Sequence, residues 1–239
     1  MSTGIIVSYD GTPNDDDALA LGRLLARTGA SLALAYVRHS REYDPRREEL
    51  AQHDAERRLE HGATWLEDPD VPRHIVVSAS TGEGLGRLAA EQGSSVIVFG
   101  SDYRTPPGRV EPGTSAQSLL DGGAVAIAVS PAGLRTKPDA GISSIAVSAE
   151  GSDTAAEQTA QALARALGAT VTTPSADGVG LVVVGSQPGA PAGRVLLSGS
   201  ARYLLETVRA PVLVVPTATP VTLGAALIRR TDKTALSGD

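Results

Sequence analysis

Short apolar runs alternate with longer amphipathic stretches through the first half of the chain. The apolar runs predict strands, and the stretches between them predict helices, because their apolar residues recur at helical spacing. This alternation is typical of βαβ units and predicts an α/β domain around an open, mostly parallel sheet. The predicted strands are Gly4–Ser8, Ser31–Val37, His74–Ala79, Ser95–Phe99 and Ala124–Val129, and the predicted helices are Asn14–Thr28, Pro45–Leu66, Glu83–Glu91 and Thr114–Leu120.

The pattern restarts after a loop at residues 131–141 that is rich in proline, glycine and charge. Residues 5–12 match residues 145–152, residues 96–101 match residues 182–186, and the tripeptide Gly108–Val110 recurs at Gly193–Val195. Several matches in the same order predict a tandem repeat. The second copy then has predicted strands at Ser143–Val147, Ala169–Thr173, Gly180–Val184 and Ala210–Val215.

The second copy is shorter than the first. Val7 and Gly100 are 93 positions apart, whereas the matching Val147 and Gly185 are 38 apart, a difference of 55. The missing block corresponds to the second helix, the third strand and the third helix. We therefore predict a complete domain at 1–132, a linker at 133–142, a truncated domain at 143–217 and a tail at 218–239. Val221–Ile228 is expected either to cover the sheet face that the missing third helix leaves open or to be disordered.

Composition narrows the function. The chain has 239 residues, of which 41% are hydrophobic but only 3% aromatic, and its net charge is -6. Few stacking side chains and a negative charge argue against nucleic acid and anionic membranes as partners. There is no cysteine, which excludes thiolate chemistry, and no apolar run of spanning length, so a cytoplasmic protein is expected.

Candidate chemistry gathers where the strands of the first copy end. Asp10 follows the first strand, Gly100 and Ser101 follow the fourth, and Gly113 with Thr114 and Ser115 opens the last helix. Backbone N–H groups at such a helix start, without a side chain in the way, form a concave site for phosphate oxygens. Ligands of doubly wound sheets usually bind at this edge.

These residues together resemble the universal stress protein family, whose ATP-binding members carry spaced glycines and a hydroxyl residue after the fourth strand. The resemblance implies a flavodoxin-like or Rossmann-like fold with strand order 3-2-1-4-5 and a bound adenine nucleotide, ATP or AMP. It implies that Asp10 and Val37 contact the adenine end and that Gly100, with Ser101, approaches the ribose. Gly113, Thr114 and Ser115 would hold phosphates, and Arg104 and Arg109 would add positive charge. In the second copy the weaker matching set is Gly185, Gly189, Gly199 and Ser200, with Glu150 in place of the aspartate.

One departure from the family motif bears on binding. Tyr103 stands at the inner glycine position and is expected to fill space that ribose or phosphate needs. Two interpretations follow: a nucleotide-binding stress-response protein with its site in the first copy, or a degenerate scaffold whose glycines only shape the turn.

Under either interpretation no catalytic or metal-binding residue is assigned, although slow ATP hydrolysis stays open. The cluster Asp15–Asp17 is interpreted as helix capping. We also expect the two copies to pair along their last strands, and pairing of whole chains into a homodimer stays open.

Overall fold

The computed structural model describes residues 4–137, 139–173 and 178–224. Every element for which the sequence analysis gave bounds is present, with ends that differ by at most two residues. The elements are, in chain order, β1 (Ile5–Ser8), α1 (Pro13–Ala26), β2 (Leu32–Arg38), α2 (Pro45–Leu66), β3 (Arg73–Val77), α3 (Thr81–Gln92), β4 (Val96–Phe99), α4 (Thr114–Leu120), β5 (Ala126–Val129), the 3-10 turn η1 (Leu134–Thr136), β6 (Ser144–Ser148), α5 (Ala155–Leu167), β7 (Thr170–Thr172), β8 (Leu181–Gly185), α6 (Gly199–Thr207) and β9 (Val212–Val215).

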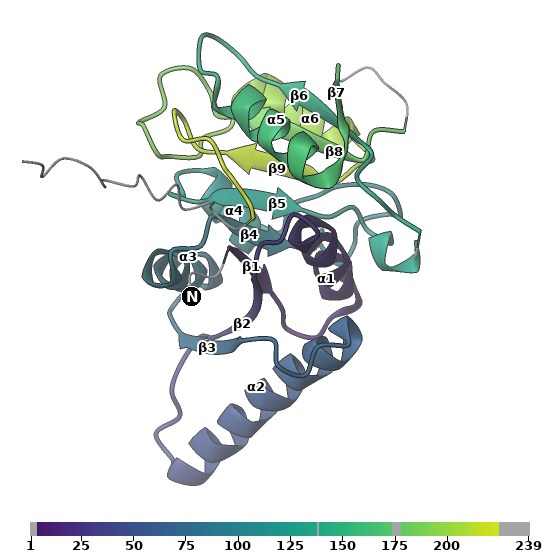
Figure 1. Cartoon of the computed structure of the whole chain (residues 1–239). Coiled ribbons are helices and arrows are strands. Elements are labelled where there is room, and N and C mark those ends of the chain that lie inside the picture. Colours follow the sequence, from purple (N-terminus) through teal and green to yellow (C-terminus); the bar gives the residue numbers. More distant parts are fainter. Residues whose placement is uncertain (1–3, 138, 174–177, 225–239) are drawn as a thin grey trace, which may run out of the picture.

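All these strands form one sheet in the order β3-β2-β1-β4-β5-β9-β8-β6-β7. The first half has the predicted order 3-2-1-4-5, and the second half has the same order without its third strand. Pairing is parallel within each half. Between the halves β5 and β9 lie side by side and run antiparallel (Figure 1). Ile127 lies opposite Val214. An α/β fold with a mostly parallel open sheet is therefore confirmed, and the domain boundaries stay a prediction.

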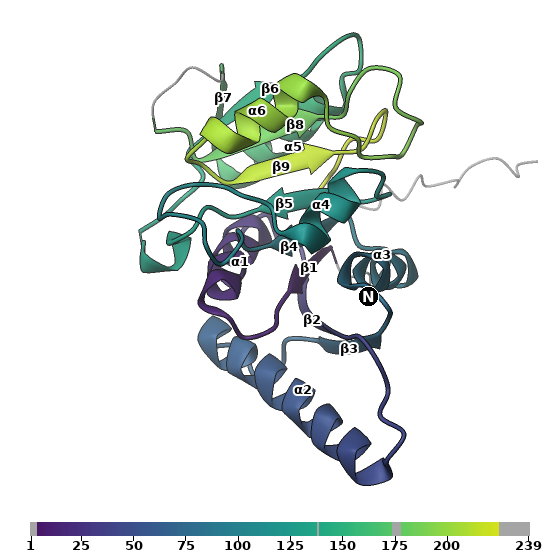
Figure 2. The ribbon, with the colours of Figure 1, turned by 180° about the vertical axis from the view of Figure 1, so that it is seen from behind.

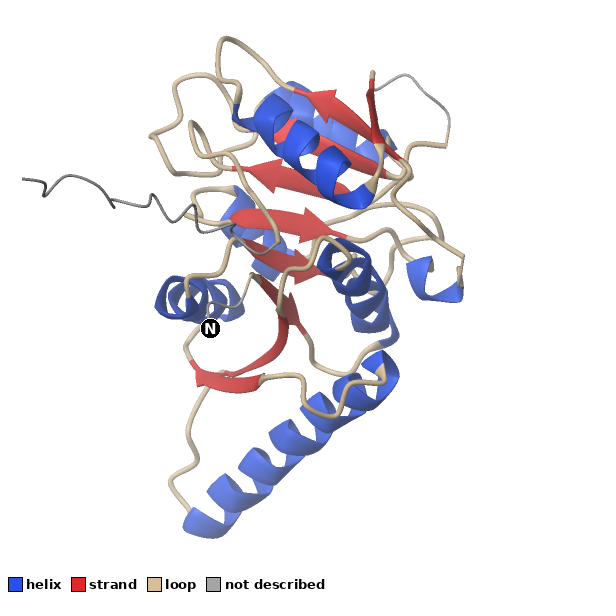
Figure 3. Ribbon diagram, viewed as in Figure 1, coloured by secondary structure: helices blue, strands red, loops and turns tan. Residues whose placement is uncertain are grey.

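Helices cover both faces of the sheet (Figure 3). Figure 1 shows α1 and α5 on the near face, and Figure 2 shows α4 and α6 on the opposite face. Alternate residues of the buried strands belong to two different hydrophobic clusters, because successive side chains of a strand point to opposite faces. Ile5, Val98 and Leu213 belong to the cluster under α1, α2 and α5, while Ile6 and Ile97 belong to the cluster under α3, α4 and α6. Each cluster contains residues of both halves.

A buried carboxylate anchors the chain where it leaves the first half. Asp17 on α1 is fully buried and accepts hydrogen bonds from the backbone N–H groups of Gly133 and Arg135, at 2.8 and 2.7 Å. The Arg135 guanidinium pairs with the same carboxylate at 2.7 Å. The interpretation of Asp17 as a helix cap is therefore wrong, since this residue binds the segment after β5 to α1. Asp15, by contrast, does accept from the backbone N–H of Thr12 at the start of α1.

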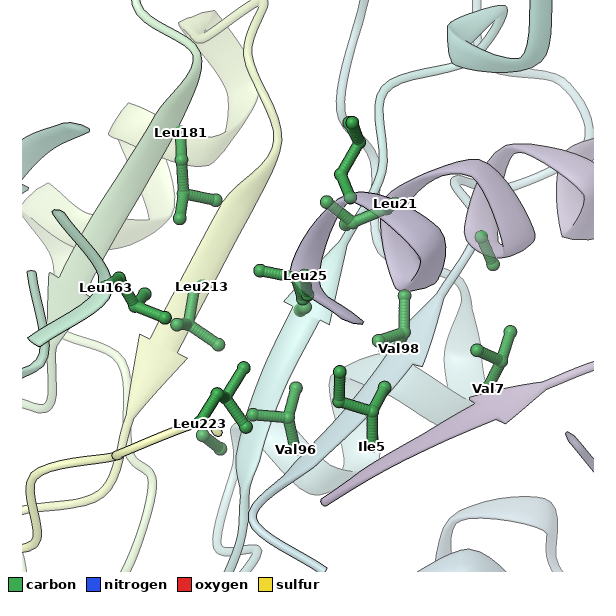
Figure 4. Packing of buried hydrophobic residues seen from close by; sticks show 14 of the residues in the cluster. Ile5, Val7, Leu21, Leu25, Val96, Val98, Leu163, Leu181, Leu213 and Leu223 are labelled. Atoms are coloured by element: carbon green, nitrogen blue, oxygen red, sulfur yellow. The ribbon is translucent and has the colours of Figure 1, made fainter. Parts of the chain in front are cut away.

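The segment after β9 does not cover the face that the sequence analysis expected. Val221 and Leu223 are buried in the cluster under α1 and α5, where Figure 4 shows Leu223 close to Leu213 and Val96. The backbone N–H of Val221 donates to Thr159 Oγ1 on α5 at 2.8 Å. The expected cover was for the opposite face, which carries α3 in the first half, so the prediction is wrong for these residues. The rest of Val221–Ile228, from residue 225, lies outside the described residues.

Candidate functional site

A cavity of about 300 Å³ lies at the carboxyl ends of β1, β2 and β4. We call it the first-half cavity. Its walls come from these strand ends, from the first turns of α1, α3 and α4, and from the middle of α2. Of the residues that the sequence analysis proposed for the first copy, this cavity is lined by Asp10, Val37, Gly100, Gly113, Thr114 and Ser115, but not by Ser101, Arg104 or Arg109.

Ser101 has a structural role instead. Its side chain is buried, its hydroxyl donates to the carbonyl oxygen of Ser130 at 2.6 Å, and it accepts from the backbone N–H of Glu111 at 3.1 Å. Ser186 repeats these contacts in the second half with the carbonyl of Val215 and the N–H of Leu196. The hydroxyl therefore ties the strand end to the neighbouring strand, and the proposal of Ser101 as a ligand contact is not supported by its position.

Gly100 is required by close packing against the start of α1. A Cβ at this position would lie 2.1 Å from the carbonyl oxygen of Asn14. The Asn14 side-chain amide donates to the carbonyl oxygens of Ser101 and Asp102, at 2.9 and 2.7 Å. Asn14 thus draws the loop after β4 onto α1, and only a glycine leaves room for this approach.

Tyr103 does not obstruct the cavity. Its side chain is 69% exposed and is not among the lining residues, and the Arg104 guanidinium lies 4.8 Å from its ring centroid. The expectation that a bulky residue here fills the ligand space is wrong. The hydrogen bonds of Asn14 hold the backbone of Ser101 and Asp102, and the side chain of Tyr103, which follows them, lies in solvent.

The two arginines expected to supply positive charge are also outside the cavity. Neither Arg104 nor Arg109 lines it. Arg109 instead crosses between the halves and donates to the carbonyl oxygen of Glu206 at 3.1 Å. Its match in the repeat, Arg194, crosses in the other direction to the carbonyl oxygen of Gly122 at 3.1 Å. The repeated tripeptide with Gly108 and Gly193 therefore contributes to the contact between halves rather than to a ligand site.

The cation that does line the cavity is Arg58 on α2. Its guanidinium donates to the carbonyl oxygen of Asp10 at 2.6 Å and to the carboxylate of Asp54 at 3.0 Å. His39, Tyr36 and Thr81 complete the polar wall. The sequence analysis did not find these residues, since the charged face of an amphipathic helix does not indicate which side chain reaches a strand end. The sequence feature that comes nearest to indicating a role for Arg58 is its position directly before Leu59, which is buried.

Asp10 and Asp15 place two carboxyl groups at the same wall. Asp15 Oδ2 accepts from the backbone N–H groups of Asp10 and Thr12, both at 3.1 Å, and from the Thr12 hydroxyl at 2.8 Å. Burial and the neighbouring Asp10 carboxyl raise the pKa of Asp15 to about 8, against the opposing effect of the Thr12 donors. The raised pKa means that the pair of carboxyl groups keeps a proton up to a higher pH than two isolated aspartates would.

The matching end of the second half is arranged differently. Glu150, which matches Asp10, turns onto the start of α6, where it accepts from the hydroxyl of Ser198 at 2.8 Å and from that of Ser200. These hydroxyls lower the pKa of Glu150 below its usual value. A carboxylate of the chain itself thus occupies the helix start that the first half leaves facing its cavity.

The other proposed second-copy residues are not brought together. Gly189 lines a cavity of about 470 Å³ with Glu150, but Gly185, Gly199 and Ser200 do not line that cavity. Gly189 has a φ of 84°, which a turn with a left-handed residue requires. Of the four proposed second-copy residues, Gly189 is therefore the one that lines this cavity.

The described residues contain neither a candidate metal site nor a candidate membrane span. No group of three or more histidine, aspartate or glutamate side chains in this part of the chain is placed to hold a metal ion. None of the described helices combines the length and apolar character needed to cross a bilayer.

Comparison with solved structures identifies the fold. A universal stress protein from Archaeoglobus fulgidus DSM 4304 matches with a TM-score of 0.65 at 12% identity, over 90% of this chain and 99% of its own. A protein of unknown function from Pseudomonas aeruginosa PAO1 matches with a TM-score of 0.60 at 15% identity, over 91% and 93%. A candidate universal stress protein from Pseudomonas aeruginosa UCBPP-PA14 matches with a TM-score of 0.59 at 14% identity, over 91% and 94%. No protein-family model and no curated protein sequence matches the chain. The chain has the fold of universal stress proteins.

Proposed function

We propose that this chain is a stress-response or regulatory protein of the universal stress protein type that binds one adenine nucleotide, AMP or ATP, in its first half. The observation that carries the proposal is the first-half cavity, which gathers Asp10, Val37, Gly100, Gly113 and Thr114 from separate parts of the sequence around one space. Its volume, about 300 Å³, is at the lower end of the range of small-molecule sites.

The chemistry of the walls supports a nucleoside with an anionic group. Val37 and Phe99 offer apolar surface for a base, and the carboxyl group of Asp10 offers acceptors for a sugar or base edge. The hydroxyls of Thr114 and Ser115 and the backbone at Gly113 offer donors for phosphate oxygens. The proposal assigns no catalytic residue, and it places the protein in the cytoplasm, in keeping with its sequence.

Calorimetric titration with AMP and ATP tests the proposal, using Gly113→Val and Gly199→Val as matched variants. Neither glycine has an atom within 4 Å of the position of an added Cβ, and neither has a positive φ, so the Cβ of either valine meets no atom of the fold. At Gly113 the valine would project into the first-half cavity. At Gly199 it would lie at the start of α6, which the carboxylate of Glu150 already covers. We expect one site per chain in the wild type, its loss in Gly113→Val and its retention in Gly199→Val. Absence of binding in the wild type would contradict the proposal.

A second candidate function is a scaffold that acts through protein partners. The antiparallel pairing of β5 with β9 and the crossed bonds of Arg109 and Arg194 favour it, because they join the two halves through contacts of the chain itself. A wild-type chain that binds neither nucleotide would favour this candidate.

A further inference from the structure

The charges around the first-half cavity are few. Among the described residues that line it, the charged or titratable side chains besides Tyr9 and Tyr36 are Asp10, Asp15, His39 and Arg58. Burial and the neighbouring Asp10 carboxyl raise the pKa of Asp15. The two carboxyl groups therefore face one permanent positive charge, that of Arg58.

The guanidinium of Arg58 already has partners within the chain. Arg58 pairs with the carboxylate of Asp54 at 3.0 Å and donates to the carbonyl oxygen of Asp10 at 2.6 Å. Its guanidinium also lies 5.6 Å from the ring centroid of Tyr36. These contacts hold Arg58 in the wall, where its guanidinium shares the carboxylate of Asp54 with Arg57, which pairs with Asp54 at 2.5 Å.

The wall formed by Gly113, Thr114 and Ser115 has neutral donors only. None of the described lining residues next to them carries an arginine or lysine side chain, and Arg104 and Arg109 are turned away to Tyr103 and to the second half. Neutral hydroxyl and backbone donors can satisfy the oxygens of one phosphate. A chain of phosphates adds further negative charge, which costs desolvation and repulsion from Asp10 without a cation to offset it.

We propose that the first-half cavity selects an adenine nucleotide with a single phosphate over a triphosphate. The proposal rests on the function proposed above and goes beyond it by naming the ligand class. Three observations carry it: the cavity is small, its one permanent cation is paired with Asp54, and the arginines expected to hold a triphosphate lie elsewhere.

The test is a set of calorimetric titrations of the full chain with adenosine, AMP, ADP and ATP at neutral pH in the presence of a metal chelator. We expect AMP to bind at least about tenfold more tightly than ATP, with ADP between them. Equal or tighter binding of ATP would overturn the selectivity while leaving the nucleotide-binding function intact. Failure of all four ligands to bind would overturn both.

Arg104→Gln serves as the matched variant, since Arg104 is exposed and outside the cavity. We expect it to leave the ratio of the ATP and AMP dissociation constants unchanged. A selective loss of ATP affinity in Arg104→Gln would show that this arginine reaches a triphosphate, and it would contradict the proposal even if AMP remained the tighter ligand.

Discussion

At the carboxyl ends of the two half-sheets, the matching acidic residues Asp10 and Glu150 differ by one methylene group and by their hydrogen-bond partners. In the first half, Asp10 stays in its own turn, where its carboxylate accepts from the backbone N–H of Thr12 at 3.1 Å. In the second half, the longer Glu150 extends to the hydroxyls of Ser198 and Ser200 at the start of α6. The same sequence position therefore lines an open cavity in one half and fills the matching place in the other.

The matching glycines at the ends of β4 and β8 also differ. Gly100, directly after β4, is held against the carbonyl of Asn14, whereas a Cβ on Gly185, the last residue of β8, would lie no closer than 3.5 Å to another atom. A motif match therefore carries different physical meaning in each half.

The largest expected effect concerns the anchors after the last strand of each half. Asp17 is fully buried and holds Gly133 and Arg135, while the more exposed Asp153 accepts from the N–H of Ala218 at 2.9 Å. We expect Asp17→Ala to lower the free energy of unfolding by about 3–5 kcal/mol, because it leaves buried partners unpaired. Asp153→Ala should cost about 1 kcal/mol. Urea denaturation measures both, and equal costs would contradict the assignment of Asp17 as the main anchor.

The next effect concerns the paired glycines. Gly100→Ala would push a methyl group into the backbone of Asn14, so we expect a loss of about 1–3 kcal/mol or more in the free energy of unfolding. Gly185→Ala meets only ordinary contacts and should change it by less than about 0.5 kcal/mol. The same denaturation experiment tests the pair. A tolerated alanine at position 100 would mean that the loop after β4 is not held against α1 as described.

A smaller effect is expected for the pH dependence of AMP binding. The pKa of Asp15 is raised to about 8, so its proton is kept below that pH and lost above it. Loss of the proton adds a negative charge beside Asp10, and the affinity for AMP should fall about three- to tenfold between pH 7 and pH 9. Adenosine, which has no phosphate, should bind almost equally at both values. In Asp15→Asn the profile for AMP should be flat, and an unchanged slope in that variant would point to another group.

The smallest effect concerns the starts of α4 and α6. Ser198 caps α6 by accepting from the N–H of Ala201 at 3.1 Å and also donates to Glu150. We expect Ser198→Ala to cost about 1 kcal/mol of unfolding free energy at neutral pH. Thr114→Ala should cost much less, since Gly113 caps α4 without a side-chain bond.

The lowered pKa of Glu150 adds a pH signature to this pair. Its contribution to stability is present where glutamate is ionised in the unfolded chain and is lost as the pH falls through the lowered folded-state pKa. The cost of Ser198→Ala should therefore shrink as the pH falls below the usual range of glutamate, and a cost that is independent of pH would contradict the bond to Glu150.

The sequence predicts the fold well, because the fold follows from local patterns. Short continuous apolar runs such as Val96–Phe99 indicate strands buried on both faces. Helix α2 has both predicted bounds, since Asp44 and Pro45 start it and the apolar stripe ends at Leu66. The missing edge strand follows from spacing alone. These features depend on periodicity, which a single sequence displays directly.

The site is predictable only in part, because it depends on directions that periodicity does not encode. Residues at strand ends and helix starts, such as Asp10 and Gly113, are placed by topology. The outward direction of the Tyr103 side chain depends on the hydrogen bonds of Asn14. The position of Arg58 at the wall of the cavity depends on how α2 packs over β2. The path of Leu223 under α1 likewise depends on where the two halves meet.

The central claim is that nucleotide binds at the first half-sheet and not at the second, and backbone amide NMR during titration with AMP tests it most directly. We predict saturable shifts for the amides of Gly100, Gly113, Thr114 and Ser115, with those of Gly189, Gly199 and Ser200 unchanged. Shifts in the second set, or no shifts in the first, would contradict the account.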